Sequence, residues 1–205
     1  MEQRIRETAE QLFFTYGLKT VSMDDIAREA GVSKKTVYQF FNDKNTIVEN
    51  VITGLVEQQQ KQLQQSSKAS KNAVHEMFLI AAGVQVLALK VRPVLLYDVN
   101  KYFPECGKLM KGFKEEDLRG ALINNLNEGI EQGLYRKNLS VDVVAQFGLI
   151  QFTSLFAPES YPNNQFNIKT VICKITELFL YGIASADGQI EIARHIHNKN
   201  NEHKS

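Results

Sequence analysis

The sequence contains no tryptophan, only four prolines and two cysteines among its 205 residues, and its formal net charge is +1. So few prolines leave room for long helices, because proline inside a helix removes a hydrogen bond and clashes with the preceding turn. The cysteines, Cys106 and Cys173, match no metal-binding or redox spacing, and we expect them to be reduced and buried. A net charge near zero excludes no partner, so a nucleic-acid function must be argued from where the charges point.

No apolar run approaches the roughly 18 residues that a membrane-spanning helix needs. The first residues, MEQRIRETAEQLFF, are amphipathic and unlike a signal peptide. Hydrophobic residues make up 43% of the chain and charged residues 23%, which are ordinary values for a soluble globular protein. We therefore expect a cytoplasmic protein with no membrane partner.

Motifs of the common enzyme classes are missing. The sequence has no P-loop, no G-x-G-x-x-G after a strand, no H-E-x-x-H and no G-x-S-x-G. His195 and His197 lie two residues apart, and on a helix their side chains would diverge, so we expect no metal site there. The sequence thus predicts a protein that is not an enzyme and has no cofactor.

Apolar residues recur at helical spacing nearly throughout, and no convincing strand alternation occurs, so we expect an all-α fold. Helices are predicted over residues 1–16, 22–30, 33–41, 44 into the glutamines, 73–91, 93–102, 104–133, 141–157 and 166–186, with Pro158 closing the eighth. Residues 58–72, rich in glutamine, are expected to be a solvated helix end that fades into a loop, and the polar tail a frayed helix. The predicted domains are 1–50 and 51–205, bridged by the helix that begins at Lys44.

Residues 23–41 have the spacing of a helix-turn-helix motif. Ala27, Gly31 and Val37 lie four and six residues apart: the small Ala27 lets a second helix approach, Gly31 makes the turn, and Val37 fills the angle between the helices. The remaining inward positions are expected to be Ile26, Ala30, Val32 and Phe40, with Phe41 also in the core. Ser22 with Asp25 resembles a capping box, and Ser33 is a suitable N-cap for the second helix.

That arrangement leaves one polar face outward. It consists of Ser33, Lys34, Lys35, Thr36, Tyr38 and Gln39. Such a helix enters the major groove, where lysines reach phosphates or guanine edges, threonine meets a thymine methyl or a phosphate, and glutamine pairs with adenine. Tyr38 is expected to donate to a phosphate, and Lys44 lies at a helix N-terminus, where a phosphate is favoured.

The stretch TYGLKTVSMDDIAREAGVSKKTVYQFFNDKNTIV resembles the DNA-binding domain of the TetR family of bacterial transcriptional regulators, with the resemblance running through residues 4–50. Glu128–Ala145 resembles the link between the seventh and eighth helices of that family. The resemblance implies a homodimer on a palindromic operator, recognition-helix positions for Lys34, Lys35, Thr36, Tyr38 and Gln39, and phosphate contacts near Thr20, Ser22, Tyr38 and Lys44. Lys35 departs from the glycine, alanine or proline of many members.

The resemblance also assigns dimerisation to the helices at 141–157 and 166–186. Their apolar residues exceed what one buried face needs: Phe147, Leu149, Ile150, Phe152, Leu155, Phe156, Val171, Ile172, Ile175, Leu178, Phe179 and Tyr181. A self-associating face fits this excess, and an ordinary monomer core is the alternative.

An effector pocket inside the C-terminal helices is the further implication. Candidate lining residues are Met77, Phe78, Tyr97, Asn100, Phe103, Met110, Phe113, Gln151 and Phe152, which would suit a mainly apolar small molecule. Each could equally be plain core. The predicted function is a repressor that such an effector releases from DNA. The alternative is a helical DNA-binding or architectural module without a regulatory ligand.

Overall fold

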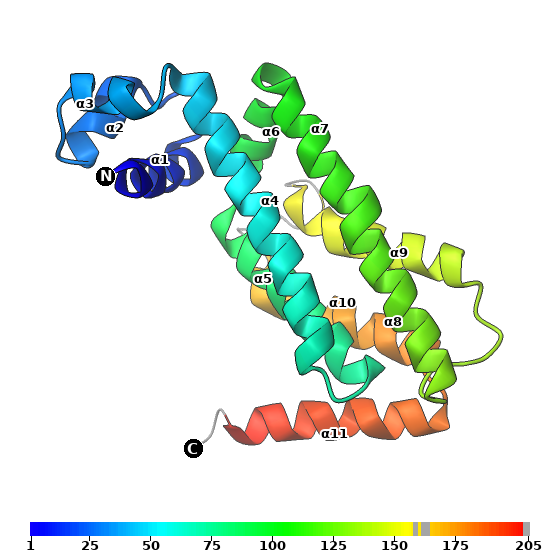
Figure 1. The fold of residues 1–205 in the computed structure, drawn as a ribbon. Helices are drawn as coiled ribbons and strands as arrows, with labels where there is room; N and C mark the ends of the chain where they lie inside the picture. Colours follow the sequence, from blue (N-terminus) through cyan, green and yellow to red (C-terminus); the bar gives the residue numbers. More distant parts are fainter. Residues whose placement is uncertain (158–159, 161–164, 203–205) are drawn as a thin grey trace. The chain divides into compact units, whose positions relative to one another are not determined.

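The computed structural model describes residues 1–157, 160 and 165–202, and within them the chain is helical, as predicted (Figure 1). An isolated bridge between Tyr135 and Ala184 is the one β-type pairing in this part of the chain. The predicted role of Pro158 in closing a helix concerns a residue outside the described ones. The all-α fold class is therefore confirmed.

The chain divides into two compact units. The first comprises Met1–Gln60 and Leu89–Phe113, and the second comprises Lys61–Ala88 and Lys114–Ser205. Each unit is thus built from two separate stretches of sequence. The sequence predicts a DNA-binding domain up to residue 50 and an effector-binding domain after it. This functional division stays a prediction.

The first unit holds the N-terminal helices and two later ones. Its elements are α1 (Glu2–Tyr16), α2 (Met23–Glu29), α3 (Lys34–Phe40), the first part of α4 (Lys44–Ala69), α6 (Pro93–Tyr102) and α7 (Pro104–Gly112). In Figure 1, α1, α2 and α3 form the blue cluster at the N-terminus. Its core includes Ile5, Phe13, Ile26, Val37 and Phe41, none more than 1% exposed. Apolar side chains brought together from three short helices therefore hold this cluster together.

The second unit is formed by the later helices and the far end of α4. It contains α5 (Ala73–Lys90) up to Ala88, the π-helical turn η1 (Phe113–Leu118) from Lys114 on, α8 (Arg119–Glu131), α9 (Val141–Thr153), the 3₁₀ turn η2 (Ser154–Phe156), α10 (Ile168–Ile183) and α11 (Ala186–Glu202). The red helix α11 lies beside the start of α5 (Figure 1). Asn72, just before α5, donates to Glu191 of α11 at 3.0 Å, and His195 of α11 stacks on Phe78 of α5.

Two helices extend further than the sequence predicts. Helix α4 continues through the glutamines to Ala69 instead of fading into a loop, and Ser66 within that stretch is only 2% exposed. This end of α4 is therefore partly buried in the second unit, and the Ser66 hydroxyl donates to the carbonyl oxygen of Gln62 within the helix. The polar tail forms the continuous helix α11, which the contacts with α5 hold in place. In both cases tertiary contacts stabilise a helix that local composition leaves undecided.

Helix α5 is long and apolar enough, by length and composition, to cross a membrane, so the expectation that no run approaches that length is wrong on this measure. One of its faces is buried in the second unit, at Met77, Ile80 and Ala81. Glu76 on the same helix is buried and accepts a hydrogen bond of 2.7 Å from Asn125 of α8. These contacts are those of a core helix in a globular unit, and we interpret α5 as one.

Candidate nucleic-acid interface

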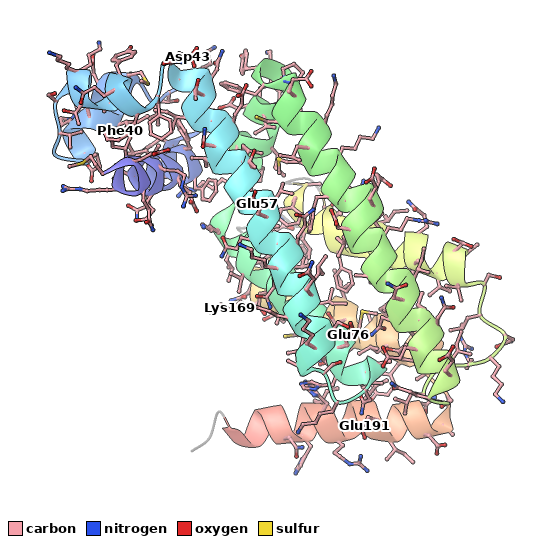
Figure 2. The ribbon with its side chains drawn as sticks, in the orientation of Figure 1. Phe40, Asp43, Glu57, Glu76, Lys169 and Glu191 are labelled. Atoms are coloured by element: carbon pink, nitrogen blue, oxygen red, sulfur yellow. The ribbon has the colours of Figure 1, made fainter. Side chains whose placement is uncertain are left out.

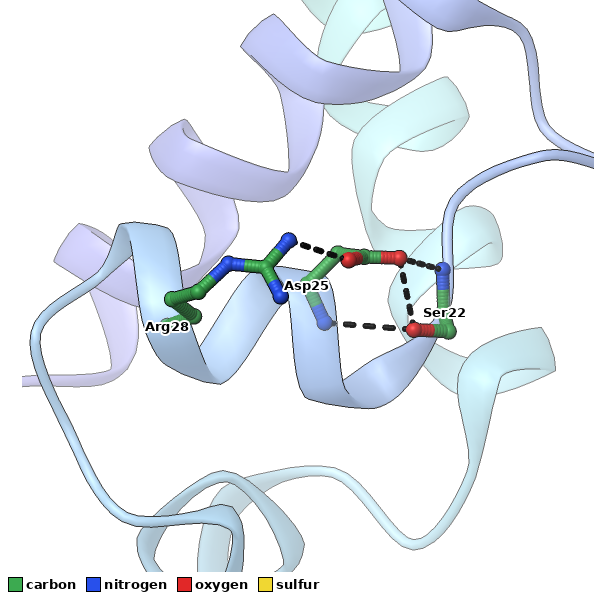
Figure 3. A network of polar contacts seen from close by, with 3 residues as sticks. All are labelled: Ser22, Asp25 and Arg28. Carbon is green, nitrogen blue, oxygen red and sulfur yellow. Dashed lines mark hydrogen bonds and ion pairs between the residues drawn. The ribbon is translucent and has the colours of Figure 1, made fainter.

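A capping box fixes the start of α2 (Figure 3). The Asp25 N–H donates to the Ser22 hydroxyl oxygen at 3.2 Å, and the Ser22 N–H donates to the Asp25 carboxylate at 3.0 Å, as predicted. The Ser22 hydroxyl donates to the same carboxylate at 2.6 Å, and Arg28 pairs with it at 2.5 Å. These donors, Ser22 first, lower the pKa of Asp25 to about 2. The hydroxyl proton of Ser22 is therefore committed to Asp25, and Ser22 must break this bond before it can donate to a phosphate.

The turn between α2 and α3 has the predicted geometry. Gly31 has a φ of +63°, a left-handed conformation that favours glycine, and its N–H donates to the carbonyl oxygen of Arg28. Ala27 and Val37 are buried at the crossing of the two helices. The helix-turn-helix spacing that the sequence predicts is thus confirmed.

Helix α3 begins at the predicted N-cap. The Ser33 hydroxyl oxygen accepts from the Thr36 N–H at 3.1 Å and lies 2.8 Å from the Thr36 hydroxyl oxygen. Within the helix, Val37 is the buried residue. The predicted contact residues on its other faces are exposed except for the half-buried Thr36: Ser33, Lys34, Lys35, Tyr38 and Gln39. The structure thus brings the predicted recognition residues together on one surface.

Phe40 corrects the sequence interpretation. Its side chain, labelled in Figure 2, is 41% exposed. The side chain of Phe41 is 1% exposed. Phe41 follows the last helical residue in an extended conformation, with φ −134° and ψ 116°, and its side chain is in the core. Of the other expected inward residues, Ile26 and Ala30 are buried and Val32 is half-buried. One aromatic side chain, not two, therefore anchors the end of α3.

The two lysines at the start of α3 differ in their surroundings. Lys34 forms an ion pair of 2.8 Å with Asp24 of α2, and the Asp24 hydrogen bond raises the pKa of the Lys34 ammonium. Lys35 is exposed and makes no ion pair with any residue that the structure describes. Lys35 is therefore available to DNA directly, whereas Lys34 must first leave Asp24.

Lys44 is half-buried at the start of α4. Its Nζ donates to the carbonyl oxygen of Lys19 in the turn between α1 and α2, at 3.4 Å. Burial lowers the pKa of the Lys44 ammonium, and the carboxylates of Asp98 and Asp25 oppose that shift. Thr20, next to Lys19, is exposed. Thr20 and Lys44, the predicted phosphate contacts, thus lie at the same turn. The carboxylate of Asp98 on α6 lies near this turn, and no sequence pattern pointed to it.

Helices α9 and α10 of the second unit divide their apolar residues between two faces. The buried ones include Leu149 and Phe152 of α9 and Val171, Ile172, Ile175, Phe179, Leu180 and Ile183 of α10, and Leu155 of the adjoining η2 is buried too. Exposed on the same two helices are Val143, Phe147, Ile150, Leu178 and Tyr181, with Leu178 at 74%. One chain therefore leaves a row of large apolar side chains in contact with water.

The candidate effector residues occur in both units. In the second unit Met77 and Phe152 are buried, and Phe78 and Gln151 are half-buried. In the first unit Phe103, Met110 and Phe113 are half-buried, whereas Tyr97 and Asn100 are exposed. The Tyr97 hydroxyl oxygen accepts from Lys101 at 2.8 Å. Their assignment to an effector site stays a prediction.

Comparison with known proteins matches residues 5–51 to the family described as "Bacterial regulatory proteins, tetR family". The chain is 24% identical to the HTH-type transcriptional repressor KstR2 of Mycolicibacterium smegmatis over 186 residues, covering 89% of this chain and 90% of that protein. The solved structure of KstR2 from Mycobacterium tuberculosis is similar with a TM-score of 0.65 and 19% identity, covering 90% of this chain and 95% of that one. FadR of Bacillus subtilis, solved in complex with stearoyl-CoA, is similar with a TM-score of 0.68 and 18% identity, over 89% and 100% of the two chains.

Proposed function

Because the chain belongs to the TetR family of bacterial transcriptional regulators, we propose that it is a cytoplasmic repressor that binds a palindromic operator as a homodimer and leaves it when a small, mainly apolar effector binds. The observation that carries the proposal is the surface of α3, whose polar side chains are exposed around the single buried Val37. A short helix presented in this way suits the major groove of DNA.

The DNA contacts divide into two kinds. Gln39 and Lys35 lie on the side of α3 opposite Val37 and read base edges, with Gln39 favouring adenine. Tyr38, Lys44, Thr20 and Lys34 contact phosphates, which position the helix without selecting a sequence. Net charge contributes little, because the whole chain carries only +1. The affinity therefore comes from this local surface, presented once by each protomer.

Two protomers associate through α9 and α10. The exposed row of Val143, Phe147, Ile150, Leu178 and Tyr181 is the support for this, since large apolar side chains in contact with water favour self-association. A two-fold dimer repeats the same patch on both partners and presents two recognition helices to successive major grooves, about 34–36 Å apart.

The effector occupies the C-terminal helices and shifts the dimer toward a form whose recognition helices no longer match that spacing. The class of ligand is supported by two relatives: one is described as a ketosteroid transcriptional regulator, and the other was solved with stearoyl-CoA. A steroid skeleton and a stearoyl chain, which these descriptions name, are hydrocarbon, and they suit candidate lining residues that are mostly apolar. Moving the population from 1:99 to 99:1 needs roughly a 10⁴-fold preference of the effector for the released form.

The test is selection of bound fragments from randomised DNA at one fixed salt concentration, followed by titration of the selected site and of a scrambled site. We expect a palindromic site that binds at least about 10³-fold more tightly than random DNA. Addition of stearoyl-CoA or of a ketosteroid to the complex then tests release. Selection without any enriched palindrome would instead favour an architectural DNA-binding module.

A further inference from the structure

The turn between α1 and α2 is held by a helix that lies far along the sequence. Gly17 begins this turn with a φ of +84°. A Cβ at that position would lie 3.1 Å from the Oδ2 atom of Asp98 and 3.5 Å from Val94, both on α6. Glycine is therefore needed both for the backbone conformation and for the close approach of α6.

The peptide groups of Lys19 are held from both sides. The Lys19 N–H donates to Asp98 Oδ2 at 3.0 Å, and the Lys19 carbonyl oxygen accepts from Lys44 Nζ at 3.4 Å. Asp98 is only 5% exposed, so its carboxylate is fixed within the first unit. A hydrogen bond from a backbone N–H to a carboxylate is among the stronger ones in proteins. The longer bond, from Lys44, is the weaker of the two hydrogen bonds to the Lys19 peptide groups.

DNA binding acts on these two bonds unequally. A phosphate at the start of α4 attracts the Lys44 ammonium away from the Lys19 carbonyl oxygen, which the long bond permits. The hydrogen bond from the Lys19 N–H to Asp98 of α6 does not involve the Lys44 ammonium, so a phosphate that binds Lys44 leaves it intact. Among the described residues it is then the remaining side-chain hydrogen bond to the Lys19 peptide groups, beside the exposed Thr20.

We propose that Asp98 is a positioning residue for DNA binding, whose carboxylate fixes the backbone of Lys19 and so places the adjacent Thr20 for its phosphate contact. The inference rests on the proposed function, since it concerns the same interface. Asp98 touches no DNA itself, and its effect passes through the Lys19 peptide. Because phosphate contacts carry no sequence information, the effect is equal on all DNA sequences.

The variants Asp98→Ala and Asp98→Asn separate the hydrogen bond from the charge. Asparagine keeps an oxygen that accepts from the Lys19 N–H, whereas alanine leaves that N–H without this partner. Arg92→Ala is the matched control, because Arg92 at the start of the same helix donates to the carbonyl oxygen of Thr15 in α1 and leaves the Lys19 bond intact. All proteins are compared as full chains, well below their unfolding transitions.

Two measurements are needed: affinity for the selected operator and a scrambled site at fixed salt, and hydrogen exchange of the Lys19 amide. We expect Asp98→Ala to weaken both DNA affinities about tenfold and to lose protection of the Lys19 amide. Asp98→Asn should restore most of both, and Arg92→Ala should change affinity less than twofold. Equal affinity of Asp98→Ala and the parent, or no rescue by asparagine, overturns the proposal.

The failure of the proposed function is a separate result. If the parent protein has no preference for any operator, the regulator hypothesis fails before Asp98 is considered. If the parent binds its operator and Asp98→Ala binds equally well, only the role of Asp98 is lost. A loss confined to the operator, with the scrambled site unaffected, also contradicts positioning through phosphates.

Discussion

Lys34 on α3 and Asp24 on α2 form an ion pair of 2.8 Å between Nζ and Oδ1, at the surface proposed to face DNA. Both side chains are more than half exposed, so the pair contributes little to stability. Its greater consequence is for binding, because Asp24 neutralises one of the two lysines at the start of the recognition helix and repels phosphates itself.

We expect Asp24→Asn to tighten binding to all DNA several-fold at low salt and to steepen the salt dependence by about one charge, because Lys34 becomes available to a phosphate. Fluorescence anisotropy over a salt series measures both quantities. Glu105→Gln is the matched control, since it removes an equally negative, exposed partner of Lys108 on α7. An equal gain in both variants would mean that net charge alone is responsible.

Gln39→Ala should change base preference at one position of each half-site by about 1–3 kcal/mol, because the side chain is proposed to read a base edge. Tyr38→Phe combined with Lys44→Ala should weaken the operator and random DNA alike, because both residues are proposed to meet phosphates. Repeating the selection from randomised DNA with each variant tests this. A uniform loss in Gln39→Ala would show that Gln39 does not read bases.

Leu178→Glu should convert the dimer into a monomer while leaving helix content unchanged. Leu178 is 74% exposed in the single chain, so the charge costs nothing there, whereas in a dimer it would be buried in an apolar interface. Sedimentation velocity gives the mass. Ile190→Glu, a change at another exposed apolar residue but on α11, is the control and should remain dimeric. A dimeric Leu178→Glu protein would place the interface elsewhere.

Tyr135→Phe should lower the free energy of unfolding by about 1–3 kcal/mol. The Tyr135 hydroxyl lies 3.1 Å from both the Ala73 carbonyl oxygen and the Asn125 side-chain oxygen, and burial raises the pKa of the phenol, so it stays a donor at every ordinary pH. Urea unfolding followed by circular dichroism measures the change. Tyr16→Phe changes a tyrosine that is 60% exposed and lies outside the proposed DNA and dimer surfaces, so it should leave stability within about 0.5 kcal/mol of the parent. Equal losses of unfolding free energy in Tyr135→Phe and in the control would show that the buried hydrogen bonds of Tyr135 are not the cause.

Acid should weaken the helix-turn-helix through Asp25. The pKa of its carboxyl is lowered from 3.8 to about 2 in the folded protein, so its contribution to stability is complete above about pH 4 and is lost as pH falls toward 2. Asp25→Asn should be less stable at neutral pH and lose less stability across that window. Ser22→Ala removes the largest cause of the shift, so the folded-state pKa of Asp25 should rise toward 3.8, and the acid-dependent loss of stability should be smaller and complete at a higher pH. Thermal unfolding as a function of pH distinguishes the three proteins, and identical acid profiles would contradict the assignment.

The local features of this protein follow from short stretches of sequence. The capping box of Ser22 and Asp25, the turn at Gly31 and the outward face of α3 all depend on residues within about one helical turn of each other or on fixed helix-to-helix spacing. For that reason the motif was predictable to within a residue. The error at Phe40 arose where the helix ends, since helical spacing no longer says which side chain enters the core.

Contacts between distant segments could not be predicted in the same way. Asp98 lies 79 residues from Lys19, and Asn72 lies 119 residues from Glu191, so no periodicity relates either pair. The continued helix at the end of α4 and the ordered α11 likewise depend on partners elsewhere in the chain. The sequence alone determined the all-α class, the helix-turn-helix and its polar surface, because hydrogen bonds and steric limits between near neighbours set them. Only the tertiary structure decided that a carboxylate of α6 holds the turn before α2, because that position results from the packing of the whole first unit.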